Sequence, residues 1–119
     1  WGGGYGNMCK VLHMIHGDLI ESYTIIDLPT FSQLTNKYLS HVLGEDKFKI
    51  VSAEGLDEEN IPTHDLFIST WALSESPEEC QDYLEENDWY GCDRFLMSFH
   101  QCGDHIPFMY ESTILKTQF

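Results

Sequence analysis

Glycines at alternate positions near the start of the chain give its first chemical signal. Gly2, Gly4 and Gly6 stand in the pattern G-x-G-x-G. Glycine accepts a positive φ, and its missing side chain lets a ligand approach the backbone closely. An amphipathic segment follows at once and predicts a helix over residues 7–16. A glycine-rich turn that opens a helix is typical of the first nucleotide-binding turn of an α/β sheet, so we expect these three glycines to bind a cofactor.

Asp27 supplies a carboxylate at the distance that such a site requires, about 20 residues beyond the glycines. The run 22–27 is β-branched and aromatic, which predicts a buried parallel strand that ends at Asp27. A carboxylate there can accept hydrogen bonds from both hydroxyls of a ribose. We therefore expect Asp27, with Leu28 beside it, to bind the ribose of the cofactor. A simple strand-end aspartate is the alternative.

The spacing of the glycines bears on which cofactor they bind. Dinucleotide-binding turns follow the pattern G-x-G-x-x-G. Counted from Gly2, the sixth position of that pattern is Asn7, and counted from Gly4 it is Cys9. Neither frame ends in glycine, so the spacing disfavours a dinucleotide.

The rest of the chain alternates between predicted strands and predicted helices. Pro29 suits the first turn of a helix that runs to Gly44, and Ser76 with Glu79 predicts a capping box at the start of a later helix. Further strands are predicted at 47–53, 64–70 and 93–99, and a further helix from Pro107. The helix that begins at Pro29 is expected to present one apolar face, formed by Phe31, Leu34, Tyr38 and Val42. Open α/β sheets bind ligands at the carboxyl ends of their strands, so the residues that follow each strand are candidate site residues.

Charge and composition exclude several classes of function. The formal net charge is −14 with only six Lys and Arg, so the chain has no basic face that could replace the counterions of a nucleic acid. No apolar run reaches the roughly 18 residues that a membrane span needs. The four cysteines form no C-x-x-C pair, which favours reduced thiols and a cytoplasmic location. We expect neither a nucleic acid nor a membrane as partner.

Two longer stretches of the sequence resemble a known family. G-G-G-Y-G-N followed by Y-T-I-I-D-L-P, and later D-L-F-I-S-T-W-A-L-S-E, are similar to the sugar O-methyltransferases, which belong to the class I S-adenosylmethionine-dependent methyltransferases. The resemblance implies a Rossmann-like three-layer α/β sandwich with a mostly parallel sheet. It also implies transfer of a methyl group from S-adenosyl-L-methionine to a sugar hydroxyl of a small molecule or glycan, and it leaves the oligomeric state open.

The resemblance further implies roles for residues that follow the predicted strands. Ala53 and Glu54 occupy the place that flanks the adenine of the cofactor. Thr70 and Trp71 leave the next strand on the ligand edge of the sheet. Trp71 would stack on the cofactor or the acceptor, with a core aromatic as the alternative.

Two residues are candidates for the general base that removes the proton of the acceptor hydroxyl. His100 is the first, because it lies just beyond the strand at 93–99 and imidazole titrates near neutrality. A histidine bonded within its own loop is the alternative. Glu75 is the second candidate. The alternative is that Glu75 belongs to the acidic surface. A metal is not expected, because the spacing H-x-C-x-x-H from His100 to His105 matches no common zinc pattern.

The resemblance covers only part of the family's domain. The chain supplies candidates for the family's second to fifth strands, whereas strand 1 and the C-terminal strands 6 and 7 are missing. Strand 1 lies between strands 2 and 4, and each buried backbone group left unsatisfied by its absence would cost about 1–3 kcal/mol. We therefore expect residues 1–119 to be a partial class I methyltransferase domain, a fragment of a longer chain.

Two other classes of function stay open. A fragment of an NAD-dependent oxidoreductase explains the glycines and Asp27 but not the glycine spacing. A non-catalytic Rossmann-like interaction module would retain the fold and dock a basic partner through the segment 75–88, which holds seven acids and no base. A solvated helix face accounts for the same acids.

Overall fold

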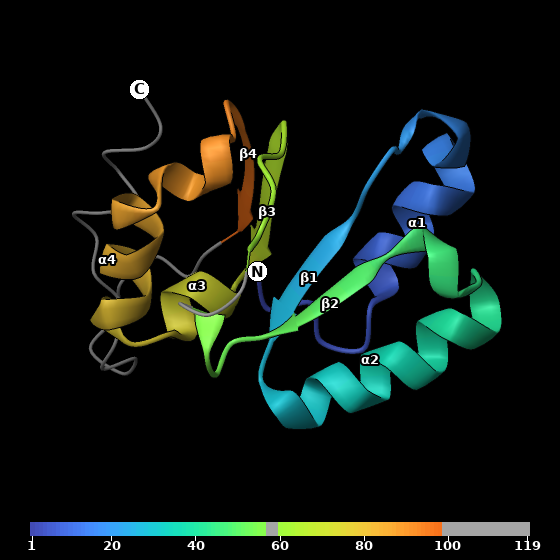
Figure 1. Cartoon of the computed structure of the whole chain (residues 1–119), viewed down its shortest axis with the longest axis horizontal. Helices are drawn as coiled ribbons and strands as arrows, with labels where there is room; N and C mark the ends of the chain where they lie inside the picture. The colour runs from blue at the N-terminus through green and yellow to red at the C-terminus, as the bar shows by residue number, and fades with distance from the viewer. Residues whose placement is uncertain (57–59, 99–119) are drawn as a thin grey trace. The chain divides into compact units, whose positions relative to one another are not determined.

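The computed structural model describes residues 1–56 and 60–98 (Figure 1). The chain divides into two compact units, Trp1–Asn60 and Ile61–Phe119, and each combines helices with one pair of short parallel strands. The chain is therefore α/β, as the sequence predicts. Within the two described ranges, no helix has both the length and the apolar character that crossing a bilayer requires.

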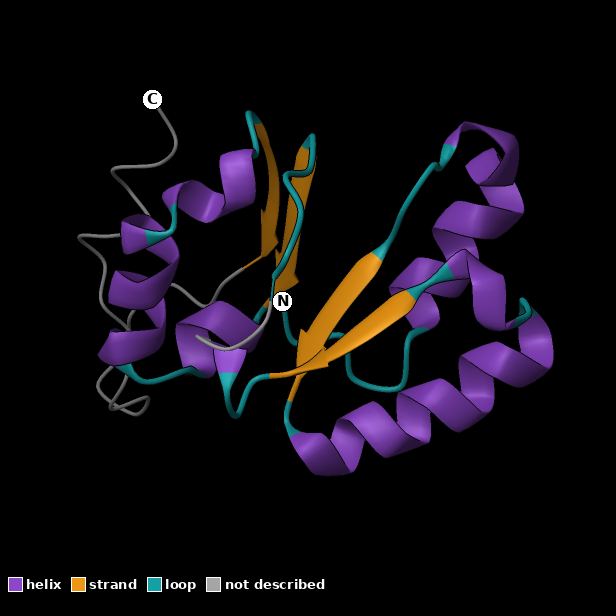
Figure 2. Ribbon diagram, viewed as in Figure 1, coloured by secondary structure: helices purple, strands orange, loops and turns teal. Residues whose placement is uncertain are grey.

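The first unit holds two helices and two strands. Its elements in chain order are α1 (Asn7–His16), the 3-10 turn η1 (Gly17–Leu19), β1 (Thr24–Asp27), α2 (Pro29–Val42), the 3-10 turn η2 (Glu45–Lys47) and β2 (Lys49–Ser52). β1 and β2 pair in parallel with Asp27 opposite Ser52, and α2 provides the crossover that a parallel pair needs (Figure 2). Both helices and both strands lie within the segments that the sequence predicts, with strand ends a few residues shorter.

One face of this strand pair packs against both helices. Cys9 of α1, Ile25 of β1 and Leu39 of α2 form the buried centre of the cluster. The packing corrects the expected face of α2. Its buried residues are Thr35 and Leu39, and most of the predicted apolar face is exposed, namely Phe31, Leu34 and Val42. The reason is that the face of α2 with Thr35 and Leu39 packs against the glycine turn. The periodicity of a single helix does not reveal which face packs against a distant segment.

The start of the chain runs along one edge of β1. Tyr23 and Asp27 direct their carbonyls toward β2, where they accept hydrogen bonds of 2.8 Å from the amides of Lys49 and Ala53. Carbonyls of consecutive residues in a strand point to opposite edges. The Ile26 carbonyl therefore faces away from β2, and it accepts a hydrogen bond of 2.8 Å from the Gly2 amide. The glycine turn is thus joined to the edge of β1 that lies opposite β2.

The second unit repeats the plan of helices beside a parallel strand pair. Its elements are β3 (Leu66–Thr70), α3 (Ala72–Glu75), α4 (Glu78–Glu86), the turn η4 (Asp88–Gly91) and β4 (Arg94–Ser98). β3 and β4 pair with Phe67 opposite Phe95. The Trp89 ring meets both of these rings edge to face, with centroids 5.2 and 5.6 Å away. Aromatic contacts of this geometry are worth about 0.5–1.5 kcal/mol each beyond the area they bury.

Trp89 reaches that cluster through a left-handed turn. Asp88, Trp89, Tyr90 and Gly91 have φ values of 49°, 49°, 56° and 73°. A non-glycine residue in this region costs about 1–2 kcal/mol. The buried Trp89 side chain offsets this cost through its contacts with Phe67 and Phe95.

The start of α4 differs from the predicted capping box. The helix begins at Glu78 behind Pro77 and has no side-chain cap. The Ser76 hydroxyl instead donates a hydrogen bond of 2.8 Å to the Ala72 carbonyl. Ser76 therefore satisfies the end of α3 and not the start of α4, because α3 ends immediately before it.

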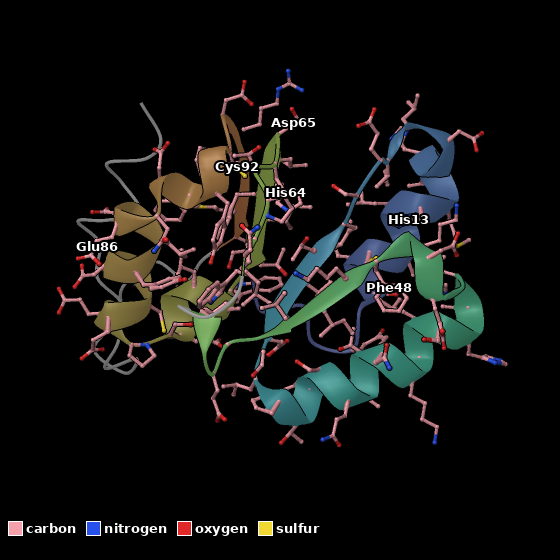
Figure 3. All side chains as sticks on the ribbon, in the orientation of Figure 1. His13, Phe48, His64, Asp65, Glu86 and Cys92 are labelled. Atoms are coloured by element: carbon pink, nitrogen blue, oxygen red, sulfur yellow. The ribbon has the colours of Figure 1, made fainter. Side chains whose placement is uncertain are left out.

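His64 lies in an environment that disfavours its charged form. It precedes β3 beside Asp65 (Figure 3), and its Nε2 is buried with no hydrogen-bond partner among the described residues. Burial lowers the pKa of His64 below its ordinary 6.5, and the Asp65 carboxylate opposes part of this shift. Between the lowered pKa and 6.5 the unfolded chain binds more protons than the folded chain.

We therefore predict that acidification through pH 6.5 destabilises the second unit. The free energy of unfolding should fall as the pH drops from 7 toward the lowered pKa of His64, and His64→Gln should flatten this fall. Urea unfolding at a series of pH values measures it, followed by tryptophan fluorescence in a Trp1→Phe background in which the two remaining tryptophans, Trp71 and Trp89, both belong to the second unit. His41→Gln, at an exposed position of α2, is the control and should keep the wild-type profile. An unchanged profile in His64→Gln would contradict the assignment.

Candidate functional site

The Asp27 carboxylate is the centre of the candidate site in the first unit. Its Oδ2 accepts a hydrogen bond of 2.7 Å from the Gly4 amide, and its Oδ1 accepts one of 2.7 Å from the Leu28 amide. Hydrogen bonds to an ionised acceptor are roughly twice as strong as neutral ones. The structure thus brings together three residues that the sequence places in one site.

The amide and the carbonyl of Gly4 both hydrogen-bond to side chains, whereas the space beside its Cα is open. Its carbonyl accepts a hydrogen bond from the hydroxyl of Thr35, which is fully buried on α2. Its φ is +55°, and a Cβ added to it would meet no atom within 4 Å. Gly4 therefore presents bare backbone next to the Asp27 carboxylate, which is the property that close approach of a ligand requires.

The neighbouring glycines serve packing. Gly6 has φ +94°, and a Cβ there would lie 2.8 Å from Cγ and Cδ1 of Leu39. Gly3 occupies a variable position of the predicted pattern, yet a Cβ there would overlap Cγ2 of Ile25. The requirement for Gly3 was missed by the pattern, although the three successive glycines at 2–4 are a signal for it. Gly2 has φ +67° and bonds to β1.

Residues that follow β2 reach the same edge of the first unit. The Ala53 amide donates to the Asp27 carbonyl at 2.8 Å. The Glu54 amide donates to the Ser52 hydroxyl at 3.1 Å, and the Glu54 side chain is exposed. The glycine turn, Asp27 and Ala53 are therefore contiguous at the carboxyl ends of β1 and β2, as the sequence predicts.

The charges of this edge are negative. Asp27 and Glu54 are acids, and residues 1–9, 27–36 and 50–56 contain no Lys or Arg. The Lys10 ammonium is placed over the Tyr38 ring, 5.9 Å from its centroid. A ligand with hydroxyl donors or a positive charge suits such an edge, whereas a phosphate would meet a carboxylate without a compensating cation.

The second unit places its candidate residues at the carboxyl end of β3. Thr70 ends the strand opposite Ser98. Trp71 follows with φ 65° and ψ −32°, an uncommon conformation that costs about 1–3 kcal/mol. Its amide donates to the Ser98 carbonyl at 2.6 Å, and its carbonyl accepts from the Ser74 hydroxyl at 2.7 Å. These two bonds hold the strained backbone in place.

The side chains of Trp71 and Glu75 face solvent. Trp71 is 49% exposed, so it is not the core aromatic of the alternative interpretation. Glu75 is exposed one turn later, and its amide donates to the Trp71 carbonyl at 3.1 Å. An exposed aromatic ring and a carboxylate one helical turn apart can contact a polyhydroxylated ligand through stacking and hydrogen bonds.

His100, the first candidate for the base, lies outside the described residues, and so does His105. Within residues 1–56 and 60–98, no three His, Cys, Asp or Glu side chains gather so as to hold a metal. The chain matches no protein-family model, and searches among curated proteins and among solved structures found no match. Functional inference therefore depends on the side chains and backbone groups described above.

We predict that two glycines of the turn differ in what they tolerate. Gly6→Ala should lower the free energy of unfolding by about 2–5 kcal/mol, because it adds left-handed strain to overlap with Leu39. Gly4→Ala should lower it by only about 1–2 kcal/mol, since its Cβ has open space. Urea unfolding followed by circular dichroism gives both values. Equal losses in the two variants would contradict the packing role of Gly6.

Proposed function

We propose that this chain is the cofactor-binding part of a Rossmann-like S-adenosylmethionine-dependent O-methyltransferase that methylates a sugar hydroxyl. The observation that carries the proposal is the Asp27 carboxylate, which ends β1 and hydrogen-bonds to Gly4 of the glycine turn. A carboxylate in this position suits a ribose whose two hydroxyls donate to it. Each carboxylate oxygen retains acceptor capacity beyond its bond to a backbone amide, so Asp27 can hold the turn and a ribose together.

The pairing of the strands supports the proposal. β1 pairs with β2 and β3 pairs with β4, both in parallel. These are the adjacencies of the second with the third strand and of the fourth with the fifth in a class I methyltransferase sheet. The bond from Gly2 to Ile26 lies on the edge of β1 where the first strand of such a sheet would run.

The charge of the edge favours S-adenosylmethionine over NAD. S-adenosylmethionine has a positive sulfonium and no phosphate, whereas NAD has a negatively charged pyrophosphate. The Gly4 amide, which a pyrophosphate would use, already donates to Asp27 at 2.7 Å. A pyrophosphate there would be repelled by the carboxylate, and no Lys or Arg in residues 1–9 would compensate for it.

The proposed reaction is an in-line methyl transfer. S-adenosylmethionine supplies a methyl group that its sulfonium has already activated. The protein holds the acceptor oxygen in line with that group, and this proximity can contribute about 7–11 kcal/mol. His100 or Glu75 takes the proton of the acceptor hydroxyl, a step that contributes about 10²–10⁴-fold. Trp71 stacks on the acceptor or the cofactor, and the acceptor is a small molecule or glycan in the cytoplasm.

We predict that the full-length protein binds S-adenosylhomocysteine and that Asp27→Ala weakens the binding at least tenfold, about 1.4 kcal/mol. The loss is expected because the alanine removes the acceptor for the ribose hydroxyls. Isothermal titration calorimetry measures both affinities, with circular dichroism to show that the variant is folded.

Asp46→Ala, which removes an exposed acid of η2, is the control for net charge and should bind like wild type. A parallel titration with NAD should give no heat of binding. A folded wild-type protein that fails to bind S-adenosylhomocysteine would overturn the proposal, and binding of NAD would favour the oxidoreductase.

A further inference from the structure

The two peptide groups that flank the Cα of Gly4 are fixed by side chains from two different elements. The amide on one side donates to Asp27 Oδ2 at the end of β1. The carbonyl on the other side accepts from Thr35 Oγ1 on α2. Asp27 was identifiable from the sequence as a site residue, whereas Thr35 stands in the middle of a helix and belongs to no motif.

We propose that Thr35 is a positioning residue of the cofactor site, an inference that rests on the function proposed above. Thr35 touches no ligand, because its side chain is fully buried. It acts through Gly4, whose carbonyl it holds toward α2. The Gly4 amide is thereby kept at the Asp27 carboxylate, and the open face of Gly4 stays at one place beside it.

A threonine inside a helix often donates to the carbonyl four residues earlier, and that interaction alone would explain a buried hydroxyl. Thr35 Oγ1 does lie 2.8 Å from the Phe31 carbonyl. A hydroxyl has one proton, however, so Thr35 can donate to only one of the two carbonyls at a time. The Phe31 carbonyl already accepts the helical bond of the Thr35 amide, whereas the Gly4 carbonyl lies outside any helix. The Thr35 hydroxyl therefore donates its proton to the Gly4 carbonyl of the turn.

Fixing the turn before the ligand arrives removes an ordering step from binding. Glycine loses more backbone entropy on ordering than any other residue. If the turn became ordered only when the ligand binds, this loss of entropy would weaken the affinity. The bonds that β1 and α2 supply to Gly4 come from protein side chains, Asp27 and Thr35. Loss of the Thr35 hydroxyl should therefore weaken binding although every ligand-contacting group is retained.

The test compares Thr35→Val, which keeps the shape and removes the donor, with Thr35→Ser, which keeps the donor. Hydrogen exchange of the Gly4 amide, followed by nuclear magnetic resonance in the full-length protein, reports the turn without any ligand. We expect Thr35→Val to accelerate it about tenfold relative to the Leu43 amide at the end of α2. Calorimetry should show binding of S-adenosylhomocysteine weakened about tenfold. Thr35→Ser should restore both values toward wild type.

Ser40→Ala is the matched control. Ser40 lies on the same helix, and its buried hydroxyl has no hydrogen-bond partner among the described residues, so both readouts should stay at wild type. If Thr35→Val does not fold, Thr35→Ala removes the same donor without adding a methyl group to the hydroxyl position.

The outcomes separate this inference from the proposed function. Wild-type exchange and wild-type affinity in a folded Thr35→Val would overturn the positioning role while the cofactor assignment stands. Faster Gly4 exchange in Thr35→Val, in a protein whose wild type binds no S-adenosylhomocysteine, would support the role of Thr35 in the turn and overturn the cofactor assignment. Equal acceleration of the Gly4 and Leu43 amides would show general destabilisation and would also overturn the positioning role.

Discussion

The hydrogen bond between the Gly4 amide and the Asp27 carboxylate is the interaction on which the first unit depends. It joins the start of the chain to the carboxyl end of β1, across 23 residues of sequence. The turn is also tied to β1 through the Gly2 amide and through the packing of Gly3 on Ile25. The same carboxylate also accepts from Leu28, where α2 begins. One side chain therefore sets the relation between the turn, the strand and the helix that follows.

The second unit has strained backbone conformations at both ends of its strand pair. Trp71 adopts a positive φ immediately after β3, and bonds to Ser98 and Ser74 hold it there. At the other end of the same strand pair, η4 has three non-glycine residues in left-handed conformations, and Trp89 among them is buried against the two strands. Strained residues persist only where their surroundings over-determine them. In η4 aromatic packing provides this support, whereas at Trp71 hydrogen bonds do so and leave the ring exposed.

Much of the element order could be predicted from the sequence, because it is encoded locally. Short β-branched runs predict the strands, and Pro29 marks the start of α2. The spacing of glycine and carboxylate also predicted that Gly4 and Asp27 lie in one site, although it did not predict the direct hydrogen bond between them. The role of Thr35 was not predictable, because it depends on a turn 31 residues away in the sequence. The run of three glycines at 2–4 is a signal for Gly3, but its partner Ile25 could not be read from the sequence. The predicted capping box at the start of α4 was wrong for a related reason, because the Ser76 hydroxyl donates to a carbonyl of α3.

Because Leu39 packs closely against Gly6, substitutions in the core and substitutions in the glycine turn depend on each other during evolution. Leu39 is fully buried, and its Cγ lies 2.8 Å from the place that a Cβ at position 6 would take. A side chain at position 6 therefore requires a smaller residue at position 39 and still carries the strain of φ +94°, whereas a side chain at position 3 requires a smaller residue at position 25. These two pairs should covary in related sequences, with the core residue changing first. Among Gly3, Gly4 and Gly6, a side chain is least costly at Gly4, where the space is open and the strain of φ +55° is the remaining obstacle.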